Sequence, residues 1–241
     1  MKRFLLLAVF QLAVLVAFSQ TWFDIGIKGG IGSSFMYNSQ IFENQEIVHK
    51  FKPGYSFGGK LGFNFIQEHQ ITFDVMKTTY NQAFTYTPAD GPAGSEKQRE
   101  YTFGGLDMLV MYRTNRSGTY FEIGPQWSTY STVKFSDNGS TDFSEEIVAK
   151  MITKSNFGMA VGFGGYIFGT DNFGVASGLR FSYMFNDMAN ADGNSANFPI
   201  LKTGESNPTH NLGVLFVIEM NYDFGYLVSS RCGQRTKLFV F

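Results

Sequence analysis

The feature that most constrains this chain is a period-two alternation of apolar with small or polar residues, which recurs in eight segments. In the first, Phe23 and Ile25 alternate with Asp24 and Gly26. Successive side chains of a strand point to opposite faces, so each segment is predicted to be a β-strand with one apolar face. The eight segments are residues 23–32, 55–65, 71–75, 106–112, 120–128, 157–164, 174–185 and 212–224.

Two of these strands are predicted to be irregular. The alternation slips at Gly104 and Gly105, where a β-bulge can be accommodated. Pro125 has no N–H to give to a ladder, so we expect a local break in the strand that contains it.

The connections between the predicted strands alternate regularly between short and long. The short ones are residues 66–70, 113–118 and 168–172, and the long ones are residues 38–52, 87–98, 136–151 and 187–210. Transmembrane barrels show this asymmetry, with short turns on the periplasmic side and long loops outside. The pattern predicts an antiparallel up-and-down barrel of eight strands over residues 20–225, with ten strands as the alternative if the tail, residues 226–241, adds two.

The residues that alternate with the apolar ones along each strand indicate which face of the barrel contacts water. It carries mostly Gly, Ala and Ser with isolated charges, and charged residues make up only 16% of the chain, against about 25% in soluble proteins. Small residues suit the crowded interior of an eight-stranded barrel. The predicted fold is therefore an all-β transmembrane barrel, and the alternative is a soluble, secreted, lipocalin-like barrel that binds a ligand.

The charged residues of this inner parity are expected to pair across strands. Acids outnumber bases by six to three when Asp223 is included, which suggests that some acids lie near the barrel ends. Charges scattered on a wet surface are the competing interpretation. The predicted structural charge network of the lumen comprises Asp24, Lys28, Lys60, Asp74, Asp107, Glu122, Arg180 and Glu219.

Aromatic residues near the strand ends are candidates for two interfacial girdles, with core packing as the alternative. Lys77 has the outward parity, which requires a place at an interface where its amine can reach water or lipid phosphate. The girdle candidates are Trp22, Tyr37, Tyr55, Tyr101, Tyr112, Tyr183 and Tyr222.

The first nineteen residues read as a secretory signal peptide. Lys2 and Arg3 precede an apolar run, residues 4–18, and Ala17-Phe18-Ser19 forms a small-x-small cleavage site before Gln20. A spanning helix needs about 20 apolar residues, more than this run provides. We therefore expect export and an outer-membrane location.

One stretch resembles a known family. Residues 106–113, Leu-Asp-Met-Leu-Val-Met-Tyr-Arg, are followed by Gly118-Thr119-Tyr120 and Gly124-Pro125-Gln126, and this run is similar to PorT-like small outer-membrane β-barrel proteins. The family often has Leu-Glu-Ile-Pro-Leu-Leu here, and Leu109 stands where its proline would be. The rhythm of strands and loops over residues 20–225 agrees with the family. The resemblance implies fold and location, and no chemistry.

No enzyme or cofactor is predicted. The net charge is −1, with 19 basic and 20 acidic residues, so there is no electrostatic case for binding nucleic acid. Cys232 stands alone, and the three histidines, His49, His69 and His210, have no metal-site spacing. We expect a structural or surface-interaction role, with membrane lipid and an unidentified extracellular or periplasmic protein as partners.

Two alternatives for function involve the long loops. Some outer-membrane barrels hydrolyse or transfer lipid acyl chains with a histidine and a serine at the outer rim, where His49 and His210 would lie. The connection 136–151 is the most acidic, and its carboxylates could hold calcium, although their spacing matches no EF-hand.

Overall fold

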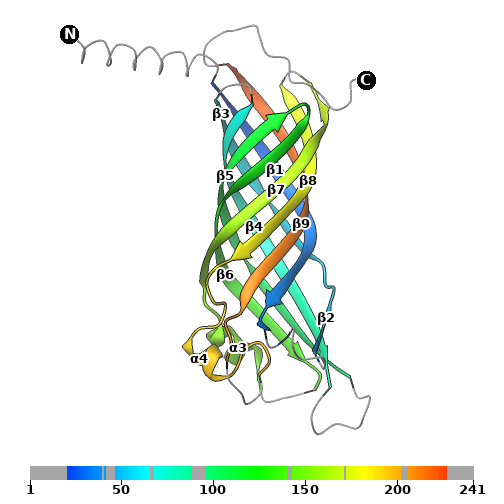
Figure 1. Cartoon of the computed structure of the whole chain (residues 1–241), viewed down its shortest axis with the longest axis vertical. Coiled ribbons are helices and arrows are strands. Elements are labelled where there is room, and N and C mark those ends of the chain that lie inside the picture. Colours follow the sequence, from blue (N-terminus) through cyan, green and yellow to red (C-terminus); the bar gives the residue numbers. More distant parts are fainter. Residues whose placement is uncertain are drawn as a thin grey trace, which may run out of the picture.

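The computed structural model describes residues 21–39, 41, 47–65, 68–87, 96–139, 143–170, 172–201 and 206–226. The predicted signal peptide, residues 1–19, lies outside the described residues, as do residues 227–241 of the predicted tail. The described chain is built of antiparallel strands that run diagonally around a common axis (Figure 1).

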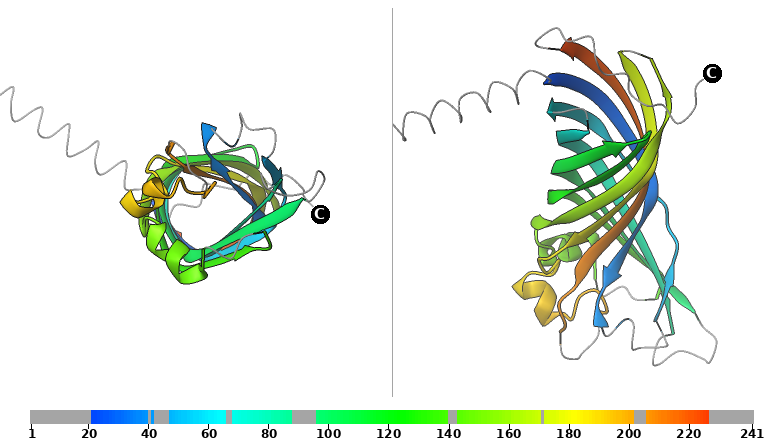
Figure 2. Two further views of the ribbon diagram at one scale, coloured as in Figure 1. Left: turned by 90° about the horizontal axis from the view of Figure 1, so that it is seen from below. Right: turned by 45° about the horizontal axis from the view of Figure 1, so that its top comes forward.

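Eight strands close the ring. Each pairs with the next along the chain, and β1 pairs with both its sequence neighbour in the ring and the last strand, as in Ile27 opposite Gly59 and Lys28 opposite Glu219. Viewed along the axis, the strands form a closed ring (Figure 2). The predicted up-and-down barrel of eight strands is confirmed. The ring consists of β1 (Trp22–Tyr37), β3 (Gly54–Phe65), β4 (His69–Tyr86), β5 (Lys97–Arg116), β6 (Thr119–Asp137), β7 (Ser155–Gly169), β8 (Phe173–Met184) and β9 (His210–Tyr226).

The short turns and long connections lie at opposite ends of the barrel, which are named here the short-turn end and the long-connection end. The turn between β5 and β6 consists of Ser117 and Gly118, both with positive φ, the backbone form that suits the twist of a tight hairpin. Because this turn is so short, β5 continues to Arg116. The prediction that a connection begins at Arg113 was wrong, and Arg113 lies within the strand.

Both predicted irregularities are present. The register between β5 and β6 shifts between Gly104 and Gly105, but the additional residue is Ser131 of β6, and the parity of β5 does not change there. The same ladder is interrupted opposite Gly124 and Pro125. On its other side Pro125 lies opposite Met159 of β7. The strand thus tolerates the missing N–H by giving up local pairing on one side only.

The alternation along each strand separates two surfaces. The outward residues form an apolar belt around the barrel, and the inward residues are polar or small. Lys77 is exposed on the outward side, opposite Leu106 at one limit of this belt. The large exposed side chains of the belt are Phe23, Ile25, Ile27, Ile31, Tyr55, Phe57, Leu61, Ile71, Phe73, Leu106, Val110, Tyr112, Phe121, Trp127, Phe157, Met159, Phe163, Phe173, Leu179, Phe181, Phe216, Ile218, Met220, Tyr222 and Phe224.

The predicted aromatic girdles need correction. Tyr37, Tyr55, Tyr112 and Tyr222 are exposed on the outside, and Tyr183 is partly exposed. Trp22 and Tyr101 are buried, at 7% and 0% exposure. Both residues have the inward parity of their strands: Tyr101 shares it with the buried Asp107 of β5, and Trp22 shares it with the buried Asp24 of β1.

The long connections contain structure that their polar sequence did not reveal. β2 (Ile47–Lys50) extends the sheet beside the far end of β4, with Ile47 opposite Tyr86. α3 (Glu145–Met151) begins at Ser144, which caps the helix by accepting a hydrogen bond from the N–H of Ile147. α4 (Ala191–Ser195) is capped in the same way by Asn190. In the described part of the chain, no helix is long and apolar enough to cross a membrane, a finding that does not concern strands.

Candidate functional site

The lumen of the barrel holds a closed ring of ion pairs. Six side chains of alternating charge contribute, from six different strands: β1, β4, β5, β6, β8 and β9. Each member contacts the next, and the last contacts the first, at N–O distances of 2.6 to 3.1 Å. In order around the ring they are Lys28, Asp74, Arg180, Glu122, Arg113 and Glu219.

Glu219 is the most connected member of the ion-pair ring. Its carboxylate lies 3.1 Å from Nζ of Lys28 and 2.6 Å from a guanidinium nitrogen of Arg113. It also binds Lys60 at 2.7 Å, outside the ring. Lys60 in turn contacts Asp24 at 2.9 Å, so a side branch extends from the ring toward the short-turn end.

Asp24 is the acid of this side branch and is held by amides as well as by Lys60. Asn64 donates to its carboxylate at 2.6 Å, and Gln70 donates to the same oxygen. These neutral donors satisfy a buried carboxylate without adding charge. With Asp24 and Lys60 included, four acids meet four bases.

The ion-pair ring fills the lumen with charge that is almost fully removed from solvent. Its side chains have at most 6% exposure. Buried ions are tolerated when each is paired and hydrogen bonded, and the two arginines satisfy this with forked contacts: Arg113 donates to both Glu122 and Glu219, and Arg180 donates to both Glu122 and Asp74.

Seven of the eight residues predicted for the lumen network lie in this cluster of ion pairs: Asp24, Lys28, Lys60, Asp74, Glu122, Arg180 and Glu219. Asp107 does not. It is buried nearer the long-connection end and accepts a hydrogen bond of 2.5 Å from the hydroxyl of Tyr80. A tyrosine, in place of a cation, satisfies this carboxylate.

Arg113 was missed in the sequence because it was assigned to a turn. Two signals pointed to it: the inward parity of residues 107, 109 and 111 continues to 113, and the inward residues showed a surplus of acid. With Arg113 counted, four of the six predicted inward acids meet four bases in the cluster of ion pairs, and the two acids outside the cluster are Asp107 and Asp223. Asp223 is also buried, close to the short-turn end of β9.

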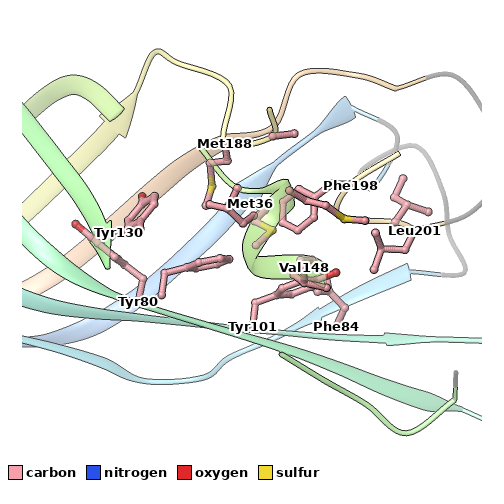
Figure 3. Close-up of a cluster of buried hydrophobic side chains, with 14 of the residues drawn as sticks. Met36, Tyr80, Phe84, Tyr101, Tyr130, Val148, Met188, Phe198 and Leu201 are labelled. Carbon is pink, nitrogen blue, oxygen red and sulfur yellow. The ribbon is translucent and has the colours of Figure 1, made fainter. Parts of the chain in front are cut away.

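Beyond the apolar belt, at the long-connection end, an apolar cap closes the barrel. We use this name for α3, α4 and residues 196–201 together with the inward strand residues that they cover. Figure 3 shows Phe198 and Val148 reaching toward Tyr101 and Phe84 of the barrel wall. The buried members of the cap are Met36, Ile41, Tyr80, Phe84, Tyr101, Phe103, Tyr130, Val148, Met151, Ile152, Met188, Ala189, Phe198, Ile200 and Leu201.

Arg99 of β5 connects the barrel to the cap through hydrogen bonds. Its Nε donates to Asp137 at 2.7 Å, and its Nη1 donates to the carbonyl oxygens of Pro199, at 3.1 Å, and Ile200. The guanidinium also lies over the ring of Tyr86, 4.8 Å from its centre. A small apolar pocket beside this contact is lined by Ile41, Ile47, Phe84, Tyr86, Arg99, Pro199 and Ile200.

The cap environment shifts the titration of its polar groups. Burial opposes the charge of Arg99, but the carboxylate of Asp137, which accepts its hydrogen bond, holds the pKa of Arg99 above its ordinary value. Burial also raises the pKa of Tyr101, and burial together with the hydrogen bond to Asp137 raises that of Tyr86. Arg99 therefore stays charged and both tyrosines stay neutral over the physiological range.

His49 and His210 both lie at the long-connection end, as the acyl-transfer alternative requires. The ring of His49 packs 4.6 Å from that of Phe84, and burial lowers the pKa of the imidazole. Nδ1 of His210 lies 3.2 Å from the carbonyl oxygen of Met184. No group of three or more potential metal-ligating side chains occurs among the described residues. Within the acidic connection, Asp137 binds Arg99, and Glu145 and Glu146 lie exposed on α3.

The fold is similar to several small outer-membrane β-barrels. Neisserial surface protein A is 12% identical, with 82% of this chain and 95% of that chain covered and a TM-score of 0.41. OprG from Pseudomonas aeruginosa is 10% identical, with coverages of 86% and 96% and a TM-score of 0.39. AlkL is 11% identical, with coverages of 89% and 95% and a TM-score of 0.36.

No family model matches the chain, and no curated protein matches it. The fold itself is defined by the strand register of this chain, and the likenesses to solved structures carry no conclusion on function.

Proposed function

We propose that this chain is an integral outer-membrane β-barrel with a closed lumen, exported by the signal peptide predicted in residues 1–19. It has a structural or surface-interaction role rather than a catalytic one. The short-turn end faces the periplasm and the cap faces outside.

The observation that carries this proposal is the apolar belt. Soluble monomers rarely expose an apolar patch above a few hundred Å², whereas here large apolar side chains surround the barrel on every strand of the ring. The belt covers about ten residues of a strand, as in residues 55–65 of β3, which is the length that a tilted transmembrane strand needs. Exposure of this apolar exterior to water is unfavourable, whereas its contact with lipid acyl chains is favourable.

The inner surface supports the same conclusion. A soluble lipocalin-like barrel would keep an apolar cavity inside and polar side chains outside, whereas this barrel has buried ion pairs inside. Eight strands leave an interior just wide enough for side chains, and open aqueous channels need about sixteen. The filled lumen therefore favours the role of a membrane anchor, which displays its outer end, and argues against the role of a solute channel.

Gel mobility and protease shaving of outer-membrane fractions test the proposal. We expect a folded band that migrates faster than the boiled protein, with cleavage in intact cells confined to the long connections. A periplasmic protein of unchanged mobility on boiling would refute the proposal in favour of the secreted barrel.

A further inference from the structure

The outward residues of three neighbouring strands, β4, β5 and β6, change from apolar to polar along a continuous line. On β4 the belt ends between Val75 and Lys77, and on β6 it ends between Trp127 and Thr129. Leu106, the last apolar outward residue of β5 before the bulge, lies opposite both Lys77 and Thr129. The three strands thus leave the apolar belt along one row of paired residues.

Beyond this line the same three strands continue as a polar wall, defined here as the outward residues of 79–85, 98–104 and 129–136. Hydroxyl and amide side chains dominate it, and several are tied to the sheet: Thr102 donates to Asn81 at 2.8 Å, and Ser131 donates to the carbonyl of Gly104 at 3.3 Å. Thr129 donates to the carbonyl of Leu106 at 3.2 Å. These bonds hold the hydroxyl groups in a fixed array.

The charge that the polar wall leaves uncompensated is positive. Glu100 is its acid, and Lys52 neutralises it at 2.6 Å. Lys77 and Lys134 are exposed, and neither takes part in an ion pair among the described residues. Lys77 stands at the edge of the belt, where a phosphate would lie, and Lys134 stands opposite Thr102, higher on the wall.

The height of the wall decides which lipid headgroup fits it. Residues 129–136 span about seven steps of about 3.4 Å, which is roughly 18 Å of height at a tilt near 40°. The headgroup region of an ordinary phospholipid bilayer is only about 5–8 Å thick on each side. A phospholipid would cover the lowest part of the wall, and a headgroup that carries several sugars would cover all of it.

We propose that the polar wall is a docking surface for a phosphorylated glycolipid of the outer leaflet. Lys77 and Lys134 meet its phosphates, and the fixed hydroxyl and amide groups of β4, β5 and β6 meet its sugars. The inference rests on the proposed function, because the wall contacts lipid only if the belt lies in the outer membrane.

Binding to lipopolysaccharide in nanodiscs tests the proposal. The folded protein is placed in discs of phospholipid alone or of phospholipid with lipopolysaccharide, and bound lipopolysaccharide and the melting temperature of the heat-modifiable band are measured. We expect saturable binding and a higher melting temperature for the wild type, and about tenfold weaker binding for the Lys77→Ser/Lys134→Ser variant. The control is Lys150→Ser, which removes an exposed lysine of α3.

The outcomes separate this inference from the proposed function. A protein that shows no heat-modifiable band in phospholipid discs fails the proposed function. A folded barrel that binds no lipopolysaccharide, or a double variant that binds as well as Lys150→Ser, overturns the docking surface alone. Sugar-truncated lipopolysaccharide probes the glycan contact, and we expect it to bind more weakly than the full molecule. Equal binding of both forms would overturn the contribution of the sugars.

Discussion

At the scale of single residues, each lumen charge is stabilised by the others rather than by solvent. Glu219 compensates Lys28, Lys60 and Arg113 at once, so its loss leaves more unbalanced charge than the loss of any single pair. A buried ion pair adds little net stability over apolar packing, but removing one partner of such a pair is costly.

We predict that Glu219→Gln lowers the free energy of unfolding by about 3–5 kcal/mol, because the amide keeps the size of the side chain and removes the charge that three cations share. Urea-induced unfolding from lipid vesicles measures this. The control is Glu100→Gln, which breaks the half-exposed pair with Lys52 and should cost no more than about 1 kcal/mol. Equal effects of the two substitutions would show that the ring of ion pairs is not a unit.

Two adjacent glycines of β3 provide a matched pair of substitutions. A Cβ on Gly58 would lie 1.9 Å from the carbonyl oxygen of Val75, whereas a Cβ on Gly59 would have no neighbour closer than 3.8 Å. We predict that Gly58→Ala slows or prevents folding into vesicles and that Gly59→Ala folds as the wild type does, with a gain of up to about 1 kcal/mol from reduced chain entropy. If both variants fold alike, then the close approach of β3 and β4 is not required.

At the scale of elements, local pattern predicted the strands and long-range contact determined the rest. The alternation located eight strands, and the glycine pair at 104 and 105 marked the place of the register shift, although the additional residue is Ser131 of β6. The elements α3, α4 and β2 were not predicted from the sequence, because such short segments become ordered only when they pack against the end of the barrel. Tyr101 is buried for the same reason: residues 196–201, far away in the sequence, cover it.

The ion-pair ring was predictable in its composition and not in its connections. Inward parity selected five of its six members, and also the two residues of the side branch, since parity is a local property of a strand. Closing the ring required Arg113, whose position depends on where the turn at Ser117 and Gly118 begins. The ends of elements are set by turn geometry and packing, and a shift of a few residues there is enough to hide a buried cation.

The short strand β2 is expected to loosen in acid. Burial between the rings of Phe35 and Phe84 lowers the pKa of His49 below the usual 6.5, so the released state binds more protons than the packed state. Packing of β2 is then fully favoured above pH 6.5 and weakens as the pH falls below that value. Protection factors from amide hydrogen exchange at residues 47–50 measure this, and His49→Phe should abolish the pH dependence.

At the scale of the whole molecule, two layers of different chemistry block the lumen. The cap closes the long-connection end with apolar side chains held by Arg99, and the ion-pair ring fills the interior next to it. Both layers consist of inward side chains, whereas the apolar belt consists of outward side chains of the same strands. Under the proposed function, this division lets the belt anchor the chain in the membrane while the long-connection end displays a surface.

Planar-bilayer conductance tests this double closure. We expect no channel steps from the wild type, and none from Arg99→Ala, in which the cap loosens and becomes sensitive to protease while the ion-pair ring still fills the lumen. Adding Asp74→Ser and Arg180→Ser removes one base and one acid together, which keeps the remaining charges balanced. This triple variant should conduct in small steps, because an eight-stranded lumen is narrow even when side chains are removed. Steps from Arg99→Ala alone would instead make the cap the sole barrier, and the ion-pair ring would then be permeable to ions.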